Sequence, residues 1–252
     1  FVGMCIDNPW LAICAVIGCS VAIITAMLIG QPRGAIECGG VTFHGMLVGI
    51  VLAASVDKGN YYGYVILPII VVSAISVYLA SGLGNIFGFF GLPAFNLPFV
   101  VAVFMSISAA TISPGVNPWF PMKSSPPLPA SAAFGTATLD WNELFKAIPL
   151  ASAQIYGSTN VITGVLVLAG MFINSPITCV NAILAPFLSI FTALAFAAPP
   201  VQIYNGSFSY NAMLTCCSLA GFFWVISIQT QVLALFSAVF ATVVHGALAK
   251  AF

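Results

Sequence analysis

The sequence has very little formal charge. Of its 252 residues, five are lysine or arginine and five are aspartate or glutamate, together 4% of the chain. A soluble domain carries about 25% charged residues, so this chain has too little polar surface to face water on all sides. Because the net formal charge is zero, nothing suggests nucleic acid as a partner.

The few charges also leave long uncharged stretches. No formal charge occurs between Lys58 and Lys123, or between Lys146 and Lys250, and each stretch could hold several membrane crossings of about 20 residues. We therefore predict an all-α integral membrane protein with about eight to nine membrane segments, together with re-entrant or broken helices. The predicted spans are 10–30, 41–56, 62–82, 92–111, 160–173, 175–197, 207–224 and 225–249.

The sequence also lacks the residue groupings of enzymes and metal sites. Its seven cysteines lie mostly in apolar runs without metal-ligand spacing, and we interpret them as small membrane-buried side chains. There is no metal-type cluster, no nucleophile paired with a base, and no phosphate-binding loop. We predict that the protein is not an enzyme and needs no cofactor.

An internal repeat appears when the sequence is shifted by 167 residues. The aligned pairs include Gly3 with Gly170, Pro9 with Pro176, Thr25 with Thr192, Pro32 with Pro199, Gly39 with Gly206 and Leu47 with Leu214. Repeats of this size form the pore at a pseudo-symmetry axis in many channels and transporters. We expect two inverted repeats, which requires an odd number of crossings in each.

The offset defines three parts of the chain. Residues 1–111 form the first repeat, 112–138 a proline-rich loop outside the hydrocarbon, and 139–252 the second repeat. The counterpart of the segment 92–99 would lie just beyond the last residue, and that of Gln154 before the first. We therefore expect the first repeat to lack its N-terminal entrance and the second its C-terminal signature segment.

Two uncharged segments contain candidate polar sites. The stretch Leu92–Phe99 has two prolines five residues apart, and each frees a carbonyl four residues earlier. Within the hydrocarbon, such freed carbonyls are tolerated in a broken helix whose carbonyls face a solute path, or in a kinked helix buried in protein. Gln154 follows a predicted amphipathic helix at 139–150, capped by Asp140; its amide needs a partner, either a solute or a neighbouring helix.

Apolar and histidine side chains are further candidates for the solute path or the core. Phe43 and Leu47 are four residues apart on one helix face, and Tyr210 and Leu214 recur one repeat later; core packing and pore lining both explain this pattern. His44 aligns with Asn211, and His245 aligns with Tyr78, so no symmetric histidine pair forms. We expect His44 to be neutral and hydrogen-bonded. The Asn205-Gly206-Ser207 sequon adjoins the predicted Tyr210 helix, which argues against its glycosylation.

These motifs resemble the urea transporter family. Leu92-Pro93-Ala94-Phe95-Asn96-Leu97-Pro98-Phe99 is similar to its signature, Leu-Pro-x-x-Thr-x-Pro-Phe, with asparagine in place of threonine. Further similar stretches are Ala147-Ile148-Pro149 with Gln154-Ile155-Tyr156-Gly157, Asn174-Ser175-Pro176, Tyr210–Leu214, Asp7–Trp10 and Ser55–Tyr61. The resemblance covers nearly the whole chain.

The resemblance implies a channel-like facilitator of urea diffusion in the cell membrane, surrounded by lipid and assembled as a homotrimer with one pore per subunit. It implies apolar slot walls at Phe43, Leu47, Tyr210, Leu214 and Ile155, and less closely at Phe208. It also implies oxygen sites at Gln154, at Asn96 and at carbonyls around Leu92–Phe95. Two alternatives stay open: a channel for ammonia, water or another amide, and a truncated membrane protein that does not conduct.

Overall fold

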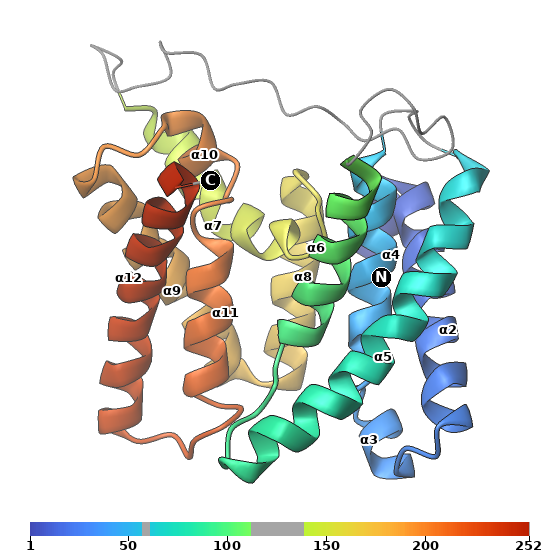
Figure 1. The fold of residues 1–252 in the computed structure, drawn as a ribbon. Coiled ribbons are helices and arrows are strands. Elements are labelled where there is room, and N and C mark those ends of the chain that lie inside the picture. Colours follow the sequence, from blue (N-terminus) through green and yellow to red (C-terminus); the bar gives the residue numbers. More distant parts are fainter. Residues whose placement is uncertain (57–60, 112–138, 252) are drawn as a thin grey trace. The chain divides into compact units, whose positions relative to one another are not determined.

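The computed structural model describes residues 1–56, 61–111 and 139–251, and the elements within them are helical (Figure 1). The helices are α1 (Val2–Asp7), α2 (Pro9–Leu28), α3 (Arg33–Glu37), α4 (Phe43–Ser55), η1 (Gly63–Val65), α5 (Ile66–Phe89), α6 (Leu97–Thr111), α7 (Trp141–Gln154), α8 (Val161–Asn174), α9 (Pro176–Ala195), α10 (Pro200–Tyr204), α11 (Tyr210–Leu219) and α12 (Ile228–Ala251). The predicted loop at 112–138 and part of the motif around Asp57 lie outside the described residues.

Each of the eight predicted spans overlaps one α-helix of the structure. Among the described residues, four helical stretches are long and apolar enough to cross a membrane: Pro9–Leu28, Gly63–Phe89, Pro176–Ala195 and Ile228–Ala249. Three further apolar helices are shorter. The span predicted at 207–224 contains α11, whose ten residues extend only about 15 Å. The structure confirms an all-α, multi-pass membrane protein.

The backbone repeats with the same 167-residue offset as the sequence. Helices α2 and α9 begin and end 167 residues apart, and so do α3 and α10. The residues that end these helices repeat their conformations too: φ is 74° at Gly30 and 51° at its counterpart Ala197, and 77° at both Gly39 and Gly206. The duplication therefore extends from sequence to local structure.

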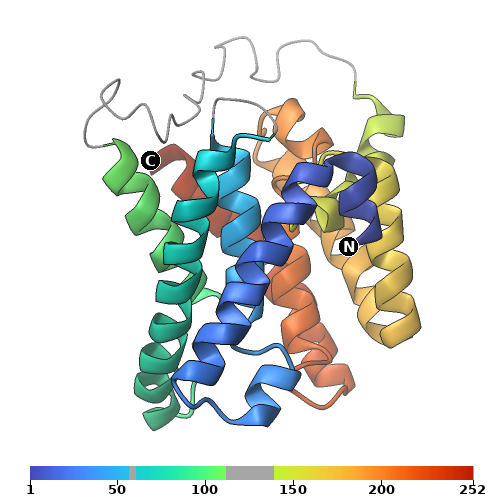
Figure 2. The ribbon, with the colours of Figure 1, turned by 90° about the vertical axis from the view of Figure 1, so that its right-hand side faces the viewer.

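One compact unit contains α2 to α6. Helices α2, α4 and α5 lie side by side (Figure 2), and glycines allow the first two to approach closely. A Cβ atom added to Gly45 would lie 2.3 Å from the carbonyl oxygen of Gly18, and one added to Gly49 would lie 2.2 Å from that of Cys14. Small residues allow membrane helices to pack backbone against backbone in this way.

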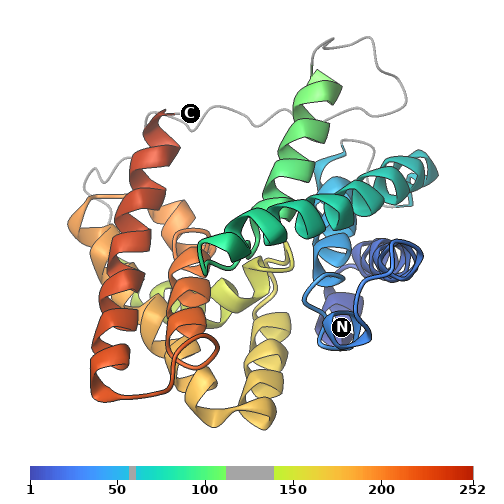
Figure 3. The same ribbon diagram turned by 60° about the horizontal axis from the view of Figure 1, so that its bottom comes forward.

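The other compact unit contains α1 and α7 to α12. Helices α11 and α12 lie side by side (Figure 3), and both pack on α9. The crossing of α9 with α11 uses Ala185 and Ala212, which are the counterparts of Gly18 and Gly45 in the first repeat. Alanine thus replaces glycine at the same crossing. The short helix α1 belongs to this unit because Thr163 on α8 donates a hydrogen bond to the Gly3 carbonyl, 2.8 Å away.

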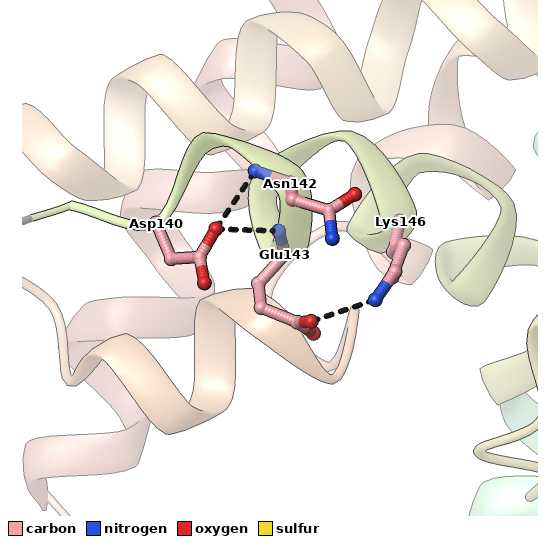
Figure 4. Close-up of polar contacts among 4 residues, drawn as sticks. All are labelled: Asp140, Asn142, Glu143 and Lys146. Carbon is pink, nitrogen blue, oxygen red and sulfur yellow. Dashed lines mark hydrogen bonds and ion pairs between the residues drawn. The ribbon is translucent and has the colours of Figure 1, made fainter.

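Helix α7 begins with the predicted cap (Figure 4). The Oδ1 atom of Asp140 accepts hydrogen bonds from the backbone N–H groups of Asn142, at 2.9 Å, and Glu143, at 3.4 Å. Lys146 then pairs with Glu143 at 2.8 Å, and this hydrogen bond raises the pKa of Lys146 above its ordinary value. Glu143 lies in the first turn, where the helix dipole favours a negative charge.

Candidate functional site

The proline-containing segment breaks the helix rather than kinking it. Helix α5 ends at Phe89, and Gly91, with φ of 68°, turns the chain so that the Leu92 N–H reaches the Phe87 carbonyl at 2.9 Å. Residues 92–96 are not helical, and α6 begins at Leu97. Pro98 therefore lies in the first turn of α6, where its missing N–H leaves no helical hydrogen bond unmade.

Three of the predicted site residues lie together in this break. Leu92 and Phe95 are exposed, at 56% and 40%, and Asn96 is half-buried. Phe95 has a φ of 49°, a conformation that is uncommon for a residue with a side chain. One of the carbonyls expected as oxygen sites already has a partner, because that of Ala94 accepts a hydrogen bond from the Leu97 N–H at 3.2 Å.

Helix α4 places Phe43 and Leu47 on one half-buried face. The ring of Phe43 contacts that of His44, with 4.0 Å between the ring centroids. His44 itself is 2% exposed, and its Nδ1 atom has no hydrogen-bond partner among the described residues. The expectation that His44 is hydrogen-bonded is therefore wrong at this atom, because the side chain is buried and no described donor or acceptor lies within its reach.

Helix α11 holds the counterparts of the Phe43 and Leu47 pair. Tyr210 and Leu214 are half-buried, and Phe208, in the turn before the helix, is 5% exposed. The ring of His245, from α12, contacts Phe208 and Tyr210. Sequence reasoning missed this histidine, because its contacts come from a helix remote in the chain.

Gln154 is the last residue of α7, and a neighbouring turn holds its side chain. Its Nε2 atom donates a hydrogen bond to the Asn205 carbonyl at 2.9 Å. The next residue, Gly206, has φ of 77°, and a Cβ atom there would lie 2.7 Å from the Ala151 nitrogen of α7. Only glycine suits that position. Sequence reasoning did not connect this turn with Gln154, although the alignment of Gly206 with Gly39 marked it as a repeated turn.

Ile155 directly follows α7 and joins a small apolar cluster. Its side chain packs against a buried group formed by Ala151, Ala182 and Met213. Met213 lies between Tyr210 and Leu214 on α11, so this cluster connects the end of α7 with the helix that holds the predicted slot wall. Gln154, Ile155, Phe208, Tyr210 and Leu214 therefore belong to one packed unit.

The chemistry of these positions is that of neutral hydrogen bonding beside apolar walls. The ten predicted site residues include no charged side chain. In the part of the chain that the structure describes, no group of three or more histidine, cysteine, aspartate or glutamate residues could hold a metal ion. The described ion pair, Lys146 with Glu143, lies near the start of α7, away from Gln154 at its end.

Comparison with known proteins identifies one family. The urea transporter family model matches residues 1–252. Urea transporter 1 of Rattus norvegicus is 35% identical over 238 residues, which cover 94% of this chain and 61% of the relative. Urea transporter 1 of Mus musculus and that of Ovis aries are each 34% identical over 239 residues, covering 95% of this chain and 62% of theirs. The chain thus spans about three fifths of the length of these relatives.

Proposed function

This chain belongs to the urea transporter family, and from that premise we propose that it mediates channel-type facilitated diffusion of urea across a membrane. The match of the family model to the whole chain carries the proposal. The helical, nearly uncharged character of the chain supports it, since apolar helices suit a path through lipid.

We propose that apolar side chains form a narrow slot for a planar solute. Phe43 and Leu47 on α4 would provide apolar wall in one unit, and Tyr210 and Leu214 on α11, with Ile155, would provide apolar wall in the other. Each pair is half-buried on one face of its helix, which leaves surface for a solute while the opposite face packs in its unit. A flat apolar slot would admit planar urea and exclude hydrated ions, which cannot shed their water there.

Oxygen atoms along the slot would replace the water that urea loses. The Nε2 group of Gln154 donates a hydrogen bond to the Asn205 carbonyl. The Oε1 atom is therefore the one that can accept a hydrogen bond from an N–H group of urea. Asn96, in the break before α6, and backbone carbonyls beside it would provide further acceptors. Each net hydrogen bond is worth about 1 kcal/mol, and several weak sites in series would let the solute pass without being trapped.

The wider setting is also part of the proposal. We propose a homotrimer in the plasma membrane, with one pore in each subunit and lipid around it. The protein would act as a transporter and not as an enzyme, because the proposed slot residues offer hydrogen bonds and apolar contact but no group that splits a bond.

Flux into proteoliposomes tests the proposal. Vesicles with the purified protein should take up urea faster than empty vesicles, and more selectively than they take up ammonia or glycerol. Equal urea rates in the two kinds of vesicle would overturn the proposal. Faster ammonia entry without faster urea entry would instead indicate a different small-solute channel.

A further inference from the structure

His245 lies where α12 meets the start of α11. The Nδ2 atom of Asn211 and the Nδ1 atom of His245 are 3.1 Å apart. The imidazole ring lies 4.8 Å from the ring of Phe208 and 6.2 Å from that of Tyr210, centroid to centroid, and both pairs are edge-to-face, at 66° and 85°. One side chain therefore contacts three residues of a short stretch.

The hydrogen bond determines the form of the imidazole. An asparagine amide nitrogen can only donate, so Nδ1 of His245 must be the acceptor. The ring proton then lies on Nε2, and the histidine is neutral. A histidine in an apolar helix needs such a partner, and here the partner is adjacent to Tyr210.

A second connection begins one turn earlier on α12 and reaches Phe208 through α9. The hydroxyl of Thr242 on α12 donates a hydrogen bond to the Ser189 hydroxyl on α9 at 2.9 Å, and Ser189 donates to the Phe208 carbonyl at 3.3 Å. Ser189 and Thr242 are both buried. The backbone of Phe208 is thus held from α9, and its ring is held from α12.

The first repeat lacks this arrangement of side chains. The counterpart of His245 is Tyr78, which is 60% exposed. The counterpart of Asn211 is His44, whose Nδ1 atom has no hydrogen-bond partner among the described residues. The two slot aromatics, Phe43 and Tyr210, therefore have different neighbours, although the backbone around them repeats.

We propose that His245 is a positioning residue that fixes the orientation of Tyr210 and Phe208, and thereby the shape of the slot wall that these two residues form. The proposal rests on the urea-channel function proposed above. Without the imidazole, the two rings would lose an edge-to-face neighbour and Asn211 its acceptor. The Tyr210 ring could then adopt other rotamers, and the slot would discriminate less well against solutes bulkier than urea.

The test is the ratio of urea permeability to N,N′-dimethylurea permeability in proteoliposomes. For His245→Leu we expect the ratio to fall about two- to tenfold, the range that the loss of one net hydrogen bond corresponds to. His245→Gln keeps an oxygen that can accept from Asn211 and should recover most of the ratio. Val244→Ala, at an exposed neighbouring position on α12, is the matched control and should leave the ratio unchanged.

Asn211→Ala gives an independent arm, which serves alone if His245→Leu does not fold and otherwise completes a double-mutant cycle. Asn211→Ala should lower the ratio, and His245→Leu should lower it less in the Asn211→Ala background than in the wild type, because both variants remove the same hydrogen bond. If wild-type vesicles conduct no urea, the urea-channel function is wrong. If they conduct urea but neither single variant changes the ratio, or if His245→Gln behaves like His245→Leu, the positioning role of His245 is wrong.

Discussion

At the scale of single residues, Gln154 shows how the fold can orient a neutral amide. Its nitrogen binds the Asn205 carbonyl, and Gly206 allows that turn to lie against α7. An amide has a donor end and an acceptor end, and the protein occupies the donor end. The oxygen is then held in one orientation, so in the proposed channel a solute that donates hydrogen bonds would meet an acceptor that is already in place.

We predict that Gln154→Leu lowers urea permeability. Leucine is of similar size but cannot accept a hydrogen bond from urea, and the loss of about 1 kcal/mol corresponds to about a fivefold slower passage if this site limits the rate. The measurement is stopped-flow urea uptake by proteoliposomes that contain equal amounts of protein.

The matched control for this substitution is Gln229→Leu, at an exposed position of α12. It should leave urea permeability unchanged. Unchanged permeability in Gln154→Leu, with normal folding and reconstitution, would remove Gln154 from the proposed oxygen sites.

At the scale of elements, the two repeats pack equivalent pairs of helices together through different residues. In the first, α2 and α4 meet at Gly18 and Gly45, with room for no Cβ atom. In the second, α9 and α11 meet at Ala185 and Ala212. The first crossing is therefore the more sensitive of the two to added volume, since even one extra methyl group destabilises a close-packed contact.

We predict that Gly45→Ala destabilises the protein by about 1–3 kcal/mol, because the added methyl group would overlap the Gly18 carbonyl. Thermal unfolding in detergent, followed by tryptophan fluorescence, should show a lower Tm. Gly82→Ala on α5 is the control: a Cβ atom there meets nothing within 4 Å, and alanine favours a helix by about 1 kcal/mol over glycine. A Tm for Gly45→Ala equal to or above that of the wild type would contradict the described crossing.

The start of α7 gives a second prediction at this scale. Asp140→Ala removes the acceptor of two backbone N–H groups and should cost about 1 kcal/mol of stability. Asp140→Asn keeps an acceptor and should cost less. Hydrogen exchange at the Asn142 and Glu143 amides is the direct measurement, and equal protection in all three proteins would show that the side chain does not cap the helix.

Sequence patterns predicted the elements better than the contacts between them. Pro9 and Pro176 mark the starts of α2 and α9, because proline suits the first helical position. The end of α11 was not predictable from hydropathy, since the apolar run continues past Ala220, where the helix has already ended. The contact of Gln154 with Asn205 spans 51 residues, and that of Asn211 with His245 spans 34. No local sequence pattern predicts contacts between residues so far apart in the chain.

At the scale of the whole molecule, duplication accounts for the order of the helices. The repeated boundaries of α2 with α9 and of α3 with α10 place Phe43 and Tyr210 at equivalent positions, each at the start of its helix. The side chains differ at some of these positions: His245 contacts Phe208 and Tyr210, whereas its counterpart Tyr78 is exposed.

The most direct test of the central claim is the entry of isotopically labelled urea into proteoliposomes with an imposed proton or sodium gradient. Facilitated diffusion predicts faster equilibration than in empty vesicles, a final internal concentration equal to the external one, and no effect of either gradient. Urea entry no faster than in empty vesicles, or accumulation above the external concentration, would contradict the account.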